Sequence, residues 1–128
     1  MKIGVSSTGK DLSSTLDMRF GRCEGFIIYD TQSKTHLAVD NPAKDASGGA
    51  GIAAAQEMIN NDVEIVITGN MGPNAYNVCS NAEIKVYKCA SVSIENALQL
   101  FSGSKLDEIK EAGPAHAGMR GGGLGRSV

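Results

Sequence analysis

The chain has 128 residues, 41% of them hydrophobic, and its 14 acidic and 12 basic side chains leave a formal net charge of -2. A chain of this length is typical of one domain with a single core. The near balance of charge excludes a strongly basic face, so we expect no nucleic-acid partner. No stretch reaches the roughly 20 apolar residues that span a bilayer, and no apolar leader opens the chain, so we predict a cytoplasmic protein without membrane association.

The cysteines favour reduced thiols. Cys23, Cys79 and Cys89 are widely spaced and include no Cys-x-x-Cys pair, which is not the pattern of a disulfide framework. Three thiols are also too few for a complete four-cysteine cluster or zinc site within one chain.

The first 40 residues predict three strands. Residues 3–5 open a short strand, and the polar stretch 6–17 that follows has no hydrophobic period and is predicted to be a loop. Residues 25–30 form an apolar run, and a polar turn connects it to a third strand at 36–40. Strands in such close succession favour an antiparallel meander.

Three helices alternate with two more strands in the rest of the chain. Ile52, Ala55 and Ile59 recur at helical spacing and predict a helix over 52–61. The elements that follow are a buried strand at 64–68, a helix at 74–80 with Pro73 at its first position, a strand at 84–87, and a helix capped by Ser93, with Ile94, Ala97, Leu98 and Phe101 on one face and Gly103 at its end.

This order predicts an α/β fold. Strands that alternate with helices imply parallel strands joined by right-handed crossovers, here a mixed five-stranded sheet with helices on both faces. We expect one domain over residues 1–112. Residues 113–128 contain six glycines and no acidic residue, so we predict a flexible glycine-rich tail.

Two glycine-rich turns, 47–51 and 68–74, each stand directly before a predicted helix. Glycine allows close approach to a ligand, and the first N–H groups of a helix are free to hold an anion. Ligands bind beyond the carboxyl ends of parallel strands, where we expect the loops 6–25, 41–51, 69–73 and 89–93 to meet. The candidate binding residues on this rim are Arg19, Phe20, Gly21, Arg22, Cys23, Gly48, Gly49, Gly51, Gly69, Asn70, Gly72 and Asn74, and the candidate metal ligands are Cys23 and Cys89.

Simpler interpretations stay open for several of these residues. The glycines could serve only tight packing between strand and helix, and one of the two arginines could only pair with Asp17 or Asp30. Cys79 is expected to pack in the core as a small apolar residue. A solvated side chain is the simplest interpretation of His36, and His116 lies in the predicted tail.

Six segments in order resemble the dinitrogenase iron-molybdenum cofactor biosynthesis family over about the first 105 residues: 2–5, 17–22, 26–30, 48–51, 67–75 and 93–101. The resemblance implies a ribonuclease H-like three-layer fold. It also implies a non-catalytic accessory protein that binds or carries an iron–sulfur or iron-molybdenum cluster and exchanges it with donor and acceptor proteins. Family members concerned with the cofactor often have a histidine immediately before the Phe-Gly pair, where this chain has Arg19.

Two other classes of function are compatible with such a fold. A metal-dependent nuclease needs carboxylates on the central strands, and the first strand offers none. A module that senses a small anion or a nucleotide, or that binds another protein through the same rim, is the alternative to the cluster carrier. The sequence does not predict the oligomeric state.

Overall fold

The structure is a computed structural model that describes residues 1–111. The predicted flexible tail at 113–128, with His116, therefore lies outside the described residues. The elements in chain order are β1 (Lys2–Ser7), β2 (Gly25–Asp30), β3 (Thr35–Asp40), α1 (Ala50–Asn60), β4 (Ile65–Thr68), α2 (Pro73–Asn81), β5 (Lys85–Lys88), α3 (Ile94–Ser102) and β6 (Asp107–Ile109). The fold class is α/β, as the order of elements predicts.

The sheet is mixed and has six strands in the order β3-β2-β1-β4-β5-β6. β1, β2 and β3 form the expected antiparallel meander, and β1, β4 and β5 are parallel. The prediction of five strands is wrong, because β6 pairs antiparallel with β5. Its sequence, Asp-Glu-Ile, has too few apolar residues to show a strand period, so the pairing depends on the free edge of β5.

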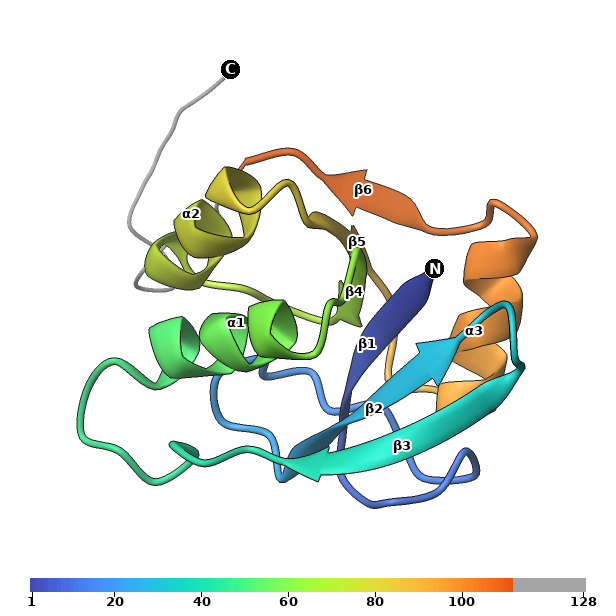
Figure 1. The fold of residues 1–128 in the computed structure, drawn as a ribbon, viewed down its shortest axis with the longest axis horizontal. Coiled ribbons are helices and arrows are strands. Elements are labelled where there is room, and N and C mark those ends of the chain that lie inside the picture. Colours follow the sequence, from blue (N-terminus) through green and yellow to red (C-terminus); the bar gives the residue numbers. More distant parts are fainter. Residues whose placement is uncertain (112–128) are drawn as a thin grey trace.

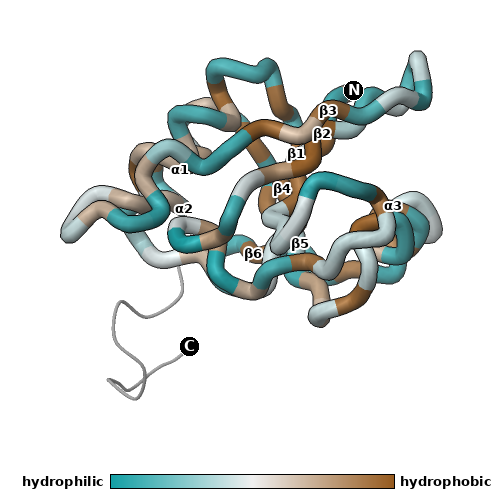
Figure 2. The backbone as a smooth tube through the Cα atoms, turned by 90° about the horizontal axis from the view of Figure 1, so that it is seen from below, coloured by the Kyte–Doolittle hydropathy of each residue, from teal (hydrophilic) through white to brown (hydrophobic). Residues whose placement is uncertain are grey.

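Helices cover both faces of this sheet, as Figure 1 shows: α1 and α2 lie on one side and α3 on the other. Each face has its own core. Phe26, Ala55, Met58, Val66 and Cys79 are among the buried residues on the side of α1 and α2. Val5, Ile27, Ile67, Ile94 and Ala97 are among those on the side of α3. The most hydrophobic part of the chain therefore follows the central strands between these two layers (Figure 2).

The buried face of α1 differs from the predicted stripe. Ala54, Ala55 and Met58 face the core, whereas Ile52 is 44% exposed. Of the predicted stripe, Ala55 is buried and Ile59 packs against the core, and only Ile52 departs from it. Three consecutive alanines leave the hydrophobic period of this helix weak, so the predicted stripe deviates at its first residue. The consequence is that Ile52 lies on the surface beside the first turn of the helix.

The topology brings the carboxyl ends of four strands to the same side of the sheet, which we call the carboxyl edge. β1 is parallel to β4 and β4 to β5, and β3 runs in the same direction because two antiparallel pairings separate it from β1. The loops that follow these strands start from this common edge. None of the helices in residues 1–111 has the length and apolar character needed to cross a membrane.

Candidate functional site

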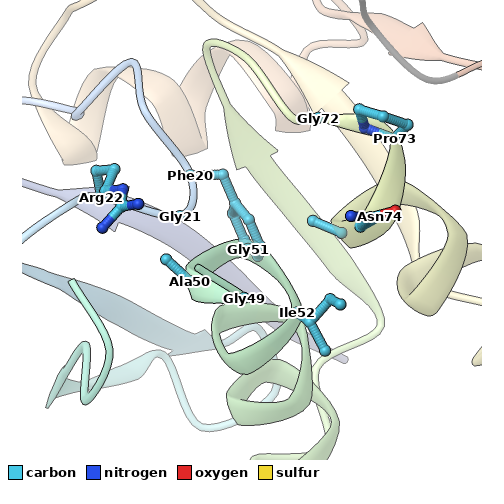
Figure 3. A pocket seen from close by; sticks show the side chains of 11 residues that line it. Phe20, Gly21, Arg22, Gly49, Ala50, Gly51, Ile52, Gly72, Pro73 and Asn74 are labelled. Atoms are coloured by element: carbon cyan, nitrogen blue, oxygen red, sulfur yellow. The ribbon is translucent and has the colours of Figure 1, made fainter. Parts of the chain in front are cut away.

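A pocket of about 490 Å³ opens at this edge, between the first turns of α1 and α2 and the loop that precedes β2. Figure 3 shows these three segments around it. The lining residues are Phe20, Gly21, Arg22, Gly49, Ala50, Gly51, Ile52, Gly72, Pro73, Asn74 and Ala75. They include one cationic side chain and no carboxylate. Segments about 50 residues apart in the sequence thus share one cavity without negative charge.

The two helices that begin at the pocket are not capped by a side chain. Gly49 and Gly72 occupy the N-cap positions of α1 and α2, and neither helix has a side-chain cap in the described part of the chain or an acidic residue in its first turn. The third helix is different, because Ser93 Oγ accepts a hydrogen bond from the Asn96 N–H at 3.1 Å and Glu95 lies in the first turn of α3. Of the three helices in residues 1–111, the two at the pocket thus have positive ends without a side-chain cap or a first-turn acid.

Five residues of the pocket lining have a backbone N–H group without an intrahelical acceptor as a result. The first intrahelical bond of α1 runs from the Ala53 N–H to the Gly49 carbonyl at 3.0 Å, and that of α2 runs from the Tyr76 N–H to the Gly72 carbonyl at 3.0 Å. The N–H groups before these bonds have no intrahelical acceptor. They belong to Ala50, Gly51, Ile52, Asn74 and Ala75, and each of these residues lines the pocket.

The glycines have two different roles in this arrangement. A Cβ at Gly21 would lie 3.0 Å from the backbone of Gly51, so this glycine lets the loop approach the start of α1. A Cβ at Gly49 or Gly72 would meet nothing within 4 Å, so these two glycines leave room beside the free helix ends. The predicted binding residue Gly48 also has open space around it but does not line the pocket.

Arg22 lines the pocket and also holds one of its walls. Its Nη1 donates to the Lys44 carbonyl at 3.0 Å and to the Ala46 carbonyl, both in the loop that precedes α1. The side chain is exposed, and its other guanidinium N–H groups make no hydrogen bond to the part of the chain that the structure describes. In Figure 3, Arg22 and Asn74 stand on opposite sides of the cavity.

Asn41 is a functional candidate that our sequence analysis missed. It is 5% exposed, and its Nδ2 donates to the Gly21 carbonyl at 3.1 Å and to the Cys23 carbonyl at 3.0 Å. Its backbone N–H donates to the Glu24 carbonyl at 3.1 Å. One amide therefore joins the loop before β2 to the loop before α1. The available signal was a polar residue that directly follows a strand at the carboxyl edge.

Three other predicted site residues do not line the pocket but brace the loop beside it. Arg19 pairs with Asp17, with Nε 3.2 Å from Oδ1 and Nη2 3.2 Å from Oδ2. Asn70 exchanges backbone bonds with this loop, donating to the Met18 carbonyl at 2.8 Å and accepting from the Phe20 N–H at 3.3 Å. Gly69 is needed there because a Cβ would come within 2.7 Å of the Met18 Cα, a backbone atom that cannot move aside.

The predicted metal ligands are buried and lie in different cores. Cys23 packs on the side of α1 and α2, where its thiol donates to the Phe20 carbonyl at 3.2 Å, and Cys89 belongs to the core on the side of α3. Burial raises the pKa of Cys23 to about 12, so the group is a neutral thiol at physiological pH. Cys79 is fully buried and packs in the core, as expected.

The arrangement therefore favours binding of an anion over direct ligation of a metal. Residues 1–111 contain no group of three or more His, Cys, Asp or Glu side chains placed to hold a metal ion. What the pocket supplies is a set of N–H donors from two helix N-termini, one guanidinium and one side-chain amide. These are the groups that stabilise a negatively charged ligand through its outer atoms.

Comparison with known proteins agrees with the sequence resemblance. The model of the family described as dinitrogenase iron-molybdenum cofactor matches residues 1–104. An uncharacterized protein of Methanocaldococcus jannaschii is 33% identical over 101 residues, which cover 77% of this chain and 86% of the relative.

Two solved structures have the same fold at similar identity. The apo form of the orange protein from Desulfovibrio gigas superposes with a TM-score of 0.84 at 32% identity, covering 88% of this chain and 95% of the other. A putative NifB protein from Thermotoga superposes with a TM-score of 0.79 at 35% identity, covering 90% and 98%. The chain therefore belongs to the dinitrogenase iron-molybdenum cofactor family.

Proposed function

We propose that this protein is a non-catalytic carrier whose pocket binds an iron–sulfur or iron-molybdenum type cluster as cargo, within a ribonuclease H-like fold. The observation that carries the proposal is the convergence of two uncapped helix N-termini on one cavity without carboxylates. Such clusters are anionic and expose sulfide, which accepts hydrogen bonds from N–H groups. Cluster donor and acceptor proteins are the partners that such a carrier requires.

A pocket whose lining offers N–H donors and one guanidinium suits a cargo that must later leave. Cargo held through hydrogen bonds and charge leaves without breaking several metal–thiolate bonds. Binding through outer atoms also allows clusters of similar size and charge to share one pocket of about 490 Å³. Release to an acceptor then requires only a second protein with greater affinity for the cluster.

The central test adds an acceptor to one of the two helix ends. Gly72→Asp places a carboxylate at the N-cap of α2, at a position with φ -73° and open space around it. We expect the carboxylate to take the free N–H groups and to repel an anion, which abolishes cluster binding. Gly72→Ala adds the Cβ alone and is the matched control, which should retain most of the binding.

Binding is measured after anaerobic reconstitution with iron and sulfide, by metal content, absorbance and EPR. No bound iron in the natural sequence, or equal iron in Gly72→Asp, contradicts the proposal. The same experiment tests Cys23 as a ligand, because Cys23→Ala should lose iron if the thiol contributes. Unchanged iron in Cys23→Ala would leave the backbone N–H groups and Arg22 as the binding groups.

The same donors suit phosphate, so a sensor of small anions or nucleotides is the second candidate. The observation that favours it is that the pocket lining holds no cysteine or histidine. Thermal-shift screening against nucleotides separates the two functions, since a ligand at about 100 times its Kd stabilises a protein by roughly 2.7 kcal/mol. A nucleotide that stabilises the natural sequence but not Gly72→Asp would favour the sensor.

A further inference from the structure

The two edges of the sheet differ in how they are protected. β6 has three residues, two of which are carboxylates, whereas β3 has six residues and carries its only acid, Asp40, at the end. Proteins blunt an exposed edge with short strands, charges, proline or a covering segment. Within residues 1–111, β3 pairs with β2 alone and forms the outer strand in Figure 1.

The side chains of β3 add apolar surface to this open edge. Leu37 is 57% exposed, the largest value among the large hydrophobic residues that the structure describes. His36 and Thr35 are also exposed, and no charged side chain interrupts the strand before Asp40. We propose that β3 pairs antiparallel with β3 of a second copy of this chain, which joins the two sheets across a two-fold axis.

The pairing geometry restricts where this axis lies. Residues directly opposite each other in an antiparallel ladder either both direct their N–H and C=O groups to the partner or both direct them away. Identical strands can therefore pair only about an axis that passes beside a residue. An axis beside Ala38 pairs His36 with Asp40, and beyond the strand ends it brings the turn before β3 towards Pro42, which has no N–H to extend the ladder.

An axis beside Leu37 buries the most apolar surface and brings opposite charges together. It places Leu37 opposite the second copy's Leu37, which covers the most exposed apolar side chain of this edge. It also brings Lys34, in the turn directly before β3, beside Asp40 of the second copy at each end of the ladder. The Asp40 side chain is 83% exposed and its Oδ1 lies 3.9 Å from Lys10 Nζ, a weak pair at the surface that leaves Asp40 available.

This register makes a charge-swap experiment decisive. Asp40→Lys puts two lysines opposite each other twice per dimer and should weaken association at least about tenfold. Lys34→Asp combined with Asp40→Lys exchanges the charges and should restore association. Asp is well suited to position 34, where φ is 60°. Asp107→Lys makes the same chemical change on β6 and is the matched control, which should leave association unchanged.

Association is measured on the full chain by sedimentation velocity from about 10 µM to about 1 mM, the range expected for a small interface. We expect a monomer–dimer equilibrium that Leu37→Lys abolishes with the fold retained. A monomer across the whole range overturns the proposal. So does a double variant that fails to associate, or Asp107→Lys acting as strongly as Asp40→Lys.

Hydrogen exchange of the β3 amides identifies the occupant of the edge. Protection that increases with protein concentration supports a second copy of the chain. Protection that is independent of concentration means that another part of the same chain covers the edge, and uniformly fast exchange of the outward amides means a free edge. Both of these last outcomes overturn the dimer. The inference does not depend on the proposed cargo, because β3 contributes no residue to the pocket.

Discussion

At the scale of single residues, one buried amide holds two loops of the pocket together. The Nδ2 group of Asn41 satisfies the carbonyls of Gly21 and Cys23 at 3.1 and 3.0 Å. Asn41→Asp replaces this donor with an acceptor, so three oxygens meet without a proton between them. We expect the free energy of unfolding to fall by about 2 kcal/mol or more, measured by urea denaturation.

Asn60→Asp is the control for this substitution, because Asn60 is exposed and its side-chain oxygen only accepts from Gln56 at 3.2 Å. It should lower stability by at most about 1 kcal/mol, because the added carboxylate lies at the C-terminal end of α1. Similar losses in the two variants would mean that the added charge, and not the lost donor, destabilises the protein. Asn41→Asp should also weaken cluster binding, since the Gly21 loop forms one wall of the pocket.

Residue types in sequence predicted most of the pocket but not its geometry. Gly49 and Gly72 were predicted from their place before helices, and both line the cavity. Cys23 and Asn41 lie on the same rim, yet one turns its thiol into the core and the other its amide onto two carbonyls. Which way a side chain turns in a loop depends on contacts about 20 residues away in the chain, and local patterns carry no such information.

At the scale of elements, the helices differ in their N-terminal caps. α3, which does not reach the pocket, has a side-chain cap, whereas α1 and α2, which begin at the pocket, have none. Ser93→Ala removes the side-chain cap of α3 and should lower the free energy of unfolding by about 1 kcal/mol. Gly72→Ser supplies the missing cap of α2 and should raise it by a few tenths of a kcal/mol while weakening anion binding. Urea denaturation measures both changes.

The contrast between the two variants is the informative result. If Gly72→Ser stabilises the protein but loses its ligand, the uncapped helix end is maintained for binding at a small cost in stability. Equal ligand binding in Gly72→Ser and the natural sequence would mean that the N–H groups of α2 do not contact the ligand.

Periodicity predicted five strands and three helices, with boundaries that differ from the structure by one or two residues at most ends. The correspondence is best for α3, whose apolar stripe and cap are both local features. It fails for β6, which has three residues, and for Ile52 in α1, where alanines blur the stripe. Both features depend on tertiary contacts: β6 on the open edge of β5, and the exposure of Ile52 on how α1 packs on the sheet.

At the scale of the molecule, the core on the side of α1 and α2 buries two thiols, Cys23 and Cys79. Burial raises the pKa of Cys23 to about 12 and that of Cys79 to about 11, from an ordinary value of 9.0. The unfolded chain therefore releases these protons near pH 9, whereas the folded protein retains them. Stability that is fully present below pH 9 is lost progressively as the pH rises towards 11 and 12.

The loss at about pH 10 should be roughly 1 kcal/mol for each thiol, because one pH unit corresponds to 1.36 kcal/mol. Lysines and tyrosines titrate in the same range, so the natural sequence alone does not isolate this effect. Cys79→Ala removes one titrating thiol and leaves the other groups in place. The difference in unfolding free energy between about pH 8 and pH 10, from urea denaturation, should be smaller in this variant by about 1 kcal/mol. An unchanged difference would mean that Cys79 ionises as readily in the folded protein as in the unfolded chain, and that the core around it admits water.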